Sequence, residues 1–309
     1  MTQRRHLTSI NDLTADDLRR LVERGAWYAS PASQGHQPLR GLVVGSYFRV
    51  TSTRTRTAFA SAALRLGAGH IPYGPGDLQL NTGESIADTA EVFGRMLDAL
   101  VVRTAGDPEE IRTLAGQKSM AVVNAMSADE HPTQALADLT TLYQRFGRLE
   151  GIRVRYVGEG NNTAAALALA LSRFAGAELC LCTPPGYGVP DPILRQATDQ
   201  AARHGAMVVE CDDPGAAIAD PHVVYTTRWQ TTGTTKPDPD WRRVFAPFRV
   251  DERLMARHPE ALFMHDLPAH RGEEVTAGVL DGLASIAFDQ AENKLHSAKA
   301  VLEWCLGRD

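Results

Sequence analysis

Short apolar runs and amphipathic segments alternate along the first half of the chain. Runs that are apolar almost throughout predict buried strands, at residues 41–48, 98–103 and 120–124. Segments with apolar residues three and four positions apart predict helices, one capped by Thr14 and others at about 54–66, 84–97, 108–115 and 133–146. Strands that alternate with helices in this way are typical of a parallel sheet covered by helices.

The alternation restarts at Gly151 and fills the second half. Strands are predicted at 152–157, 177–182, 206–210, 223–226 and 262–264, with helices at 162–174, 192–204 and 288–306. Residues 231–248 show no period and hold three prolines, so we predict a long irregular loop, which is typical of a lid. The whole pattern predicts an α/β protein with two parallel-sheet domains of similar size, residues 1–147 and 151–285, and a hinge near 147–151.

Composition narrows the class of protein. The 309 residues suffice for two domains, and 43% hydrophobic with 22% charged residues is ordinary for a folded chain. A net charge of −5 argues against nucleic-acid binding, and no apolar run approaches a membrane span or the core of a signal peptide. The four cysteines lack zinc-site spacing and are expected to be buried thiols in a reducing compartment. We therefore expect a soluble cytoplasmic protein without a bound metal.

Two motifs of the first half suggest anion and carbonyl chemistry. Residues 52–56, Ser-Thr-Arg-Thr-Arg, stand between a strand and a helix, where unpaired N–H groups, hydroxyls and guanidinium groups favour phosphate. The alternative is a capped helix with two solvated arginines. His131 and Gln134 flank the helix start that Pro132 fixes, so they are suited to polarise a carbonyl and hold an amide. Here the alternative is a capping histidine.

Two motifs of the second half follow buried strands. Residues 158–163 half-match a dinucleotide-binding loop, but Thr163 replaces the last glycine and Glu178 begins its strand rather than ending it, which disfavours a nicotinamide site. Residues 265–274, His-Asp-Leu-Pro-Ala-His-Arg-Gly-Glu-Glu, place polar groups at the carboxyl end of a strand, where ligands bind in such sheets. No helical histidine pair of the zinc-protease type is present.

Six segments in this order resemble the aspartate/ornithine carbamoyltransferase family along nearly the whole chain. They are residues 48–56, 83–103, 131–139, 157–162, 264–276 and 289–300. The resemblance implies a first domain for carbamoyl phosphate, a second domain for the amine and an active site in the cleft between them. It also implies a closing helix (286–309) that packs back on the first domain, a homotrimer, and no cofactor.

The resemblance also assigns roles. Ser52, Thr53, Arg54, Thr55 and Arg103 would hold the phosphate, and His131 would donate a hydrogen bond to the carbonyl oxygen. Gln134 and the backbone carbonyls at 266–267 would hold the carbamoyl NH2. Gln79 would enter from a neighbouring subunit, although Thr82 stands where aspartate enzymes bring a lysine to this loop. Arg271 matches an arginine that helps to hold carbamoyl phosphate. The expected catalytic residues are Arg54, Arg103, His131, Gln134 and Arg271, together with Asp266, whose carboxylate departs from the family motif.

The acceptor side carries mixed signals. Thr227 replaces an aspartate that grips the α-amino group in ornithine enzymes, and Asp266 replaces a cysteine. Arg228 and Gln230 resemble the aspartate branch. The residues expected to bind the amine are Asn162, Thr227, Arg228, Gln230, Asp266 and Leu267. We interpret them as a site for a specialised diamino acid such as 2,3-diaminopropionate. The alternatives are an ordinary ornithine enzyme, a silent binding paralogue, and an Asp266 that merely pairs with Arg228 or Arg271.

Overall fold

The computed structural model describes residues 4–215, 219–231 and 233–309. The chain divides into two compact units, one of residues 1–141 with 292–309 and the other of residues 142–291. The sequence predicted the boundary between the domains near 147–151, whereas the division between the two units lies inside helix α5 (Pro132–Phe146). The C-terminal helix α11 (Ala287–Cys305) counts with the first unit from Glu292 onward.

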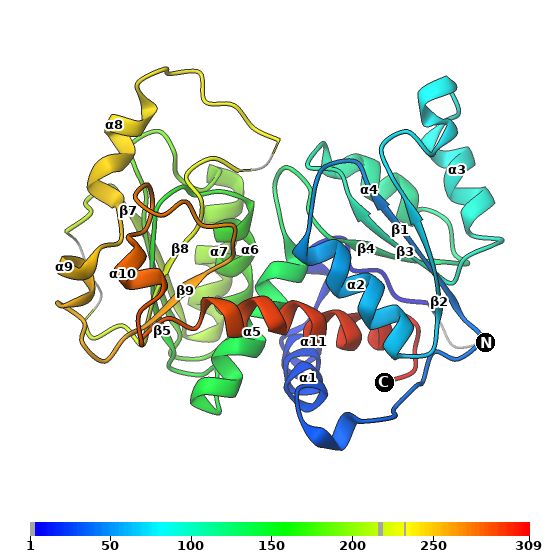
Figure 1. The fold of residues 1–309 in the computed structure, drawn as a ribbon, viewed down its shortest axis with the longest axis horizontal. Helices are drawn as coiled ribbons and strands as arrows, with labels where there is room; N and C mark the ends of the chain where they lie inside the picture. Colours follow the sequence, from blue (N-terminus) through cyan, green and yellow to red (C-terminus); the bar gives the residue numbers. More distant parts are fainter. Residues whose placement is uncertain (1–3, 216–218, 232) are drawn as a thin grey trace. The chain divides into compact units, whose positions relative to one another are not determined.

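The first unit is built on a parallel sheet with the strand order β2-β1-β3-β4 (Figure 1). Its elements are η1 (Ile10–Asp12), α1 (Ala15–Tyr28), η2 (Pro31–Ser33), β1 (Val43–Phe48), α2 (Arg54–Arg65), β2 (Gly69–Tyr73), η3 (Gln79–Thr82), α3 (Ile86–Phe93), β3 (Ala99–Arg103), α4 (Pro108–Ala115), β4 (Ala121–Asn124) and α5. Strand β3 is buried along its whole length, because it lies between two neighbours and beneath helices.

Local chemistry fixes the ends of these elements. Thr14 accepts a hydrogen bond from the N–H of Asp17 at 3.0 Å, and the Asp17 carboxylate accepts the N–H of Thr14 at 3.0 Å, which is a capping box. Helix α11 is held to α1 by the buried Glu303, which accepts hydrogen bonds from Arg24 at 2.7 Å and from the Tyr28 hydroxyl at 2.9 Å. The closing helix therefore packs on the first unit, as the resemblance implied.

The second unit repeats the design with the strand order β7-β6-β5-β8-β9, again all parallel (Figure 1). Its elements are β5 (Arg153–Val157), α6 (Asn162–Leu171), β6 (Glu178–Cys182), α7 (Asp191–His204), β7 (Met207–Cys211), β8 (Val223–Thr226), α8 (Trp241–Phe245), η4 (Ala246–Phe248), α9 (Glu252–Met255), β9 (Leu262–His265) and α10 (Ala277–Leu280). Every residue of the alanine-rich α6 is buried. The predicted fold class, two parallel-sheet α/β domains, is confirmed.

Two sequence predictions on secondary structure were wrong. Residues 231–248 are not irregular throughout, because α8 and η4 form there, with Trp241 and Phe245 buried against Trp229. That helix depends on long-range aromatic packing, which periodicity does not reveal. Strand β2 was missed because it is a mostly exposed edge strand that contains Pro72. In the part of the chain that the structure describes, no helix is long and apolar enough to cross a membrane.

Candidate active site

Each sheet has a point where the strand order reverses, and several of the predicted site residues follow the strands that meet there. In the first unit the chain passes from β1 outward to β2 and then back to β3 on the other side of β1. Phe48 at the end of β1 lies opposite Arg103 at the end of β3. Residues 52–55 follow β1, and His131 follows β4. Open α/β sheets bind ligands at the carboxyl edge beside such a point, and these residues lie at that edge.

The loop at 52–56 leaves a helix start open to an anion. Helix α2 begins at Arg54, and the side chain of its N-cap, Thr53, makes no capping hydrogen bond. The first N–H groups of the helix thus keep no side-chain cap, which suits a phosphate. Thr55 is buried and Arg54 half-buried. Arg56 is exposed and lies over the Phe48 ring at 5.2 Å from its centroid, so it belongs to the outer surface.

His131 is held in a defined neutral form. Its Nε2 lies 3.2 Å from a terminal nitrogen of Arg103, and its Nδ1 lies 3.3 Å from the Thr133 hydroxyl. Because a guanidinium only donates, Nε2 accepts, and the ring proton sits on Nδ1 and points to Thr133. Burial, with Arg103 and Lys294 nearby, holds the pKa of His131 well below its ordinary value. Donation from Nε2 to a substrate carbonyl, as the resemblance implies, therefore requires the other tautomer.

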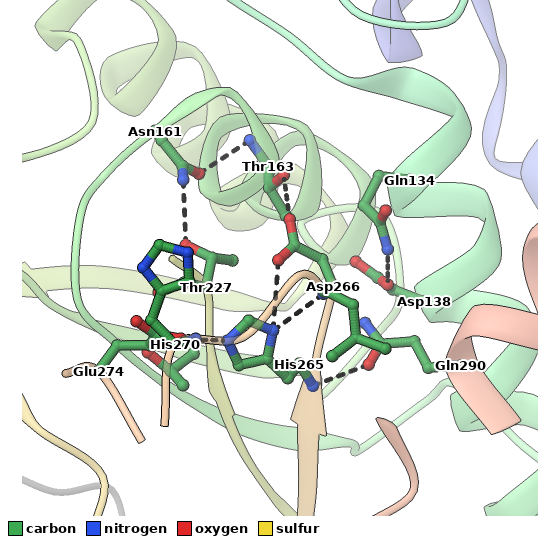
Figure 2. Close-up of polar contacts among 12 residues, drawn as sticks. Gln134, Asp138, Asn161, Thr163, Thr227, His265, Asp266, His270, Glu274 and Gln290 are labelled. Atoms are coloured by element: carbon green, nitrogen blue, oxygen red, sulfur yellow. Dashed lines mark hydrogen bonds and ion pairs between the residues drawn. The ribbon is translucent and has the colours of Figure 1, made fainter. Parts of the chain in front are cut away.

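Gln134 is oriented by two charged side chains that sequence reasoning missed. Its amide nitrogen donates to Asp138 at 2.7 Å, and its amide oxygen accepts from the ammonium of Lys294 on α11 (Figure 2 shows the Asp138 contact). A carboxylate only accepts and an ammonium only donates, so these partners fix which end of the amide faces which way. The contact with Asp138 could have been predicted, because residues four positions apart on a helix are neighbours. The contact with Lys294 could not, because 160 residues separate it from Gln134.

Gln79 lies on the exposed turn η3. Its side-chain oxygen accepts a hydrogen bond from the Thr82 hydroxyl at 2.7 Å. Thr82, the residue found where the aspartate branch has a lysine, therefore orients Gln79 instead of supplying a charge.

In the second unit the strand order reverses between β5 and β8, and a chain of neutral hydrogen bonds crosses that point (Figure 2 shows its contact between Asn161 and Thr227). The Tyr156 hydroxyl donates to the carbonyl oxygen of Glu159 at 2.7 Å. Having one proton, it must accept from the Thr227 hydroxyl, 2.8 Å away, and Thr227 in turn accepts from the Asn161 amide at 3.0 Å. Thr227 is 1% exposed and uncharged, so it supplies no anion in place of the family aspartate.

The other residues expected to bind the amine lie around the same edge of the sheet. Asn162 is buried as the first residue of α6, next to the N-cap Asn161. Arg228 is half-buried, and no carboxylate pairs with it among the described residues. Gln230 donates to the carbonyl oxygen of Thr234 at 2.8 Å and so stabilises its own turn. Thr232, which belongs to the same motif, lies outside the described residues.

Asp266 follows β9 and lies beside α6. One of its oxygens accepts from the Thr163 hydroxyl at 3.2 Å (Figure 2). Neither of the ion pairs considered from the sequence is present: no carboxylate of the described residues pairs with Arg228, and Arg271 pairs with Asp281 at 2.6 and 2.9 Å on the surface. Arg271 is thus directed to Asp281 and not to Asp266.

A buried histidine fixes the turn that carries Asp266. Nδ1 of His265 accepts from the N–H of Leu267 at 2.9 Å, so Nε2 carries the proton and donates to the buried Glu274 at 3.1 Å. Leu267 has a φ of +53°, which non-glycine residues adopt at a cost and often at functional sites. Its carbonyl oxygen accepts no hydrogen bond from the residues that the structure describes, so it is available to a ligand N–H.

Comparisons with known proteins agree with this geometry. Residues 5–144 match the family model for the carbamoyl-P binding domain of aspartate/ornithine carbamoyltransferase, and residues 150–305 match the model for its Asp/Orn binding domain. An ornithine carbamoyltransferase of Symbiobacterium thermophilum is 41% identical over 302 residues, 96% of each chain. The structure of the Pyrococcus furiosus ornithine carbamoyltransferase superposes with a TM-score of 0.92 at 37% identity, covering 99% of both chains. That of the anabolic enzyme of Campylobacter jejuni gives 0.90 at 30% identity, covering 99% of this chain and 100% of that one.

Proposed function

Because the chain belongs to the aspartate/ornithine carbamoyltransferase family and is therefore a carbamoyltransferase, we propose that it carbamoylates the side-chain amine of L-ornithine. The products are citrulline and phosphate. The observation that carries the proposal is the grouping of Arg103, His131 and the open helix start at Arg54 at one sheet edge. The names of the relatives, all ornithine carbamoyltransferases, support ornithine as the acceptor.

The first unit supplies the groups that the electrophile needs. The amine nitrogen attacks the carbonyl carbon, the bond from that carbon to the phosphate oxygen breaks, and the attacking nitrogen loses one proton. Negative charge grows on the carbonyl oxygen and on the departing phosphate. Fixed donors from Arg54 and Arg103 stabilise that charge, and His131 adds a donor once substrate selects the tautomer with the proton on Nε2. His131 acts here as a neutral donor, because its pKa is depressed. Gln134, held by Asp138 and Lys294, presents an oriented amide to the carbamoyl NH2.

The second unit supplies the groups for the amino acid. Asn162 and Arg228 are the proposed partners of the substrate carboxylate, and the carbonyl of Leu267 accepts an N–H of the carbamoyl group. Asp266 faces the substrate ammonium or the attacking amine, where a carboxylate orients a cationic group and accepts its proton. One of its oxygens accepts a hydrogen bond from Thr163, and the other lies 3.6 Å from Nδ1 of His265.

A second acceptor class, a shorter diamino acid such as 2,3-diaminopropionate, is favoured by one feature of the second unit. Thr227 is neutral and bound into the Asn161–Tyr156 chain of hydrogen bonds, so the anion that grips the α-ammonium in ornithine enzymes is missing. Asp266, at the end of β9, instead places a carboxylate at this edge of the sheet. The carboxylate then follows β9 instead of β8. We infer that this position suits a substrate whose two amines are closer together than those of ornithine.

The deciding experiment is a competition between acceptors. The enzyme is mixed with carbamoyl phosphate and, separately, L-ornithine, L-2,4-diaminobutyrate, L-2,3-diaminopropionate and L-aspartate, and phosphate and ureido products are quantified. The highest kcat/KM with ornithine supports the proposal, and a higher value with either shorter diamine selects the second acceptor class. No ureido product from any amine would identify a silent paralogue.

The variant Asp266→Cys sharpens that experiment, because it restores the residue of the ornithine motif. If Asp266 reads the acceptor, the ratio of kcat/KM values between ornithine and the shorter diamines shifts by roughly tenfold or more toward ornithine. A ratio unchanged from the wild type would show that Asp266 does not select the acceptor.

We also propose that the protein is a homotrimer in which Gln79 completes a neighbour's site. Inactive Gln79→Ala and Arg54→Ala proteins are dissociated, mixed and reassociated. Mixed trimers would then contain sites with an intact Arg54 and a Gln79 from the neighbour, and activity would reappear. Light scattering that shows a monomer, or mixtures that stay inactive, would contradict this assembly.

A further inference from the structure

Three cysteines of the second unit form a cluster that the proposed reaction does not use. Cys180 and Cys182 lie two residues apart on β6, so their side chains leave the same face of the sheet. Cys211 on β7 lies opposite Cys182 in the parallel register. The Sγ atoms of Cys180 and Cys211 are each 3.8 Å from Sγ of Cys182, and all three lie within 4.8 Å of one another.

This spacing matches a metal–thiolate site. With a zinc–sulfur bond of about 2.3 Å in tetrahedral geometry, two sulfur ligands lie about 3.8 Å apart. Spacing in the sequence does not reveal this cluster, because Cys211 comes from the neighbouring strand, 29 residues after Cys182. Cys180 and Cys182 are buried and Cys211 is half-buried, so the cluster reaches the surface at one side.

A buried cation beside the thiols is a second, independent sign. Arg155 lies opposite Cys180 in the β5–β6 register and is 0% exposed. Its terminal nitrogens contact Nε2 of His258 at 2.8 Å and the carbonyl oxygen of Pro214 at 2.7 Å. Its Nε has no hydrogen-bond partner, and no carboxylate pairs with the guanidinium, among the residues that the structure describes. A buried charge without a counter-charge is strongly disfavoured.

We propose that Cys180, Cys182 and Cys211 bind one Zn²⁺ ion as thiolates, with a fourth position left for water. Three thiolates around a divalent cation carry a net charge of about −1, and Arg155 supplies the matching positive charge. The bound ion would tie β6 to β7 at their carboxyl ends. The alternative is that the thiols are only small apolar side chains in the core that also contains Val224 and Phe263.

Cadmium is the spectroscopic probe for this site. The metal-free, reduced full-length protein is titrated with Cd²⁺, and the thiolate-to-cadmium charge-transfer band in the ultraviolet is followed, with Zn²⁺ as the competitor. We expect one Cd²⁺ per chain, displaced by Zn²⁺. Cys182→Ser and Cys211→Ser should lower the affinity at least tenfold, and Arg155→Met by about 10- to 100-fold, as for partners outside the ligand shell.

Cys305→Ser is the matched control, because Cys305 is a buried thiol of α11 in the first unit. It should leave the titration unchanged. A measurement on the wild type covers the case in which a serine variant does not fold: Cd²⁺ should slow alkylation of the half-buried Cys211 by iodoacetamide. Absence of the band, a band that Cys211→Ser leaves intact, or unchanged alkylation would overturn the proposal.

Discussion

The two switch points share a topology but differ in charge. At the first, β1 and β3 present the guanidinium of Arg103 and the open start of α2, with a buried neutral His131 beside them. At the second, β5 and β8 present the neutral chain from Asn161 through Thr227 to Tyr156. A phosphate is recognised by charge and by backbone N–H groups, so its site leaves little choice of residues. An amino acid is recognised by where its charges lie, so the choice of residues on the proposed acceptor side can change with the acceptor.

The largest expected effect tests the charged side of this comparison. Arg54→Ala should lower kcat/KM by roughly 100- to 1,000-fold, because a fixed cationic donor at the developing charge is lost. Arg56→Ala is the matched control, since Arg56 lies outside on the Phe48 ring. Steady-state kinetics with a circular-dichroism check of folding decides, and an active Arg54→Ala enzyme would remove the phosphate assignment.

A smaller effect on catalysis is expected from Arg228 on the proposed acceptor side. No carboxylate of the described residues pairs with it. Arg228→Ala should raise KM for any acceptor with a carboxylate by about tenfold or more, which is the loss of a charged hydrogen bond of about 1.5–3 kcal/mol. Binding of carbamoyl phosphate, measured by calorimetry, should not change. If Arg228→Ala instead weakened the binding of carbamoyl phosphate and left the KM of the acceptor unaltered, Arg228 would belong to the phosphate site.

The neutral chain should matter more for folding than for chemistry. Thr227→Val leaves the Asn161 donor and the Tyr156 oxygen without their partner in a buried place, which costs about 1–3 kcal/mol. Thr198→Val, on the exposed face of α7, should change stability by less than about 0.5 kcal/mol. Urea unfolding measures both. Equal stabilities of the two variants would show that the hydrogen bonds of Thr227 do not stabilise the fold.

The smallest effect is a pH dependence from His131. Its folded pKa lies below its unfolded value, so below about pH 6.5 the unfolded chain takes up a proton that the folded one does not. The titration of His131 therefore lowers the free energy of unfolding progressively as the pH falls below about 6.5, and it has no effect well above that pH. His131→Gln should make the loss of stability between about pH 7.5 and pH 5.5 smaller than in the wild type. An identical loss in both proteins would mean that His131 titrates normally.

The sequence predicted those parts of the fold that rest on local signals. Helix α4 begins at Pro108 and ends at Ala115 as expected, and β8 spans Val223–Thr226 as expected, because a helix-start proline and a fully buried apolar run mark them. Helix α8 could not be predicted, since its aromatic residues form a core only with Trp229. At the site, motif positions were visible in the sequence, whereas their partners came from elsewhere in the chain. Tyr156 and Lys294 reach Thr227 and Gln134 from 71 and 160 residues away.

The ammonium of Lys294 has a consequence for the order in which the protein is made. It reaches Gln134 from α11, which is synthesised after every strand, and Glu303 anchors α11 to α1, which is synthesised before every strand. A nascent chain that has finished β1 to β4 carries the residues proposed to hold the phosphate, yet the Lys294 ammonium reaches the Gln134 oxygen only after α11 has been made. A product truncated before α11 would therefore lack the contact that orients the Gln134 oxygen.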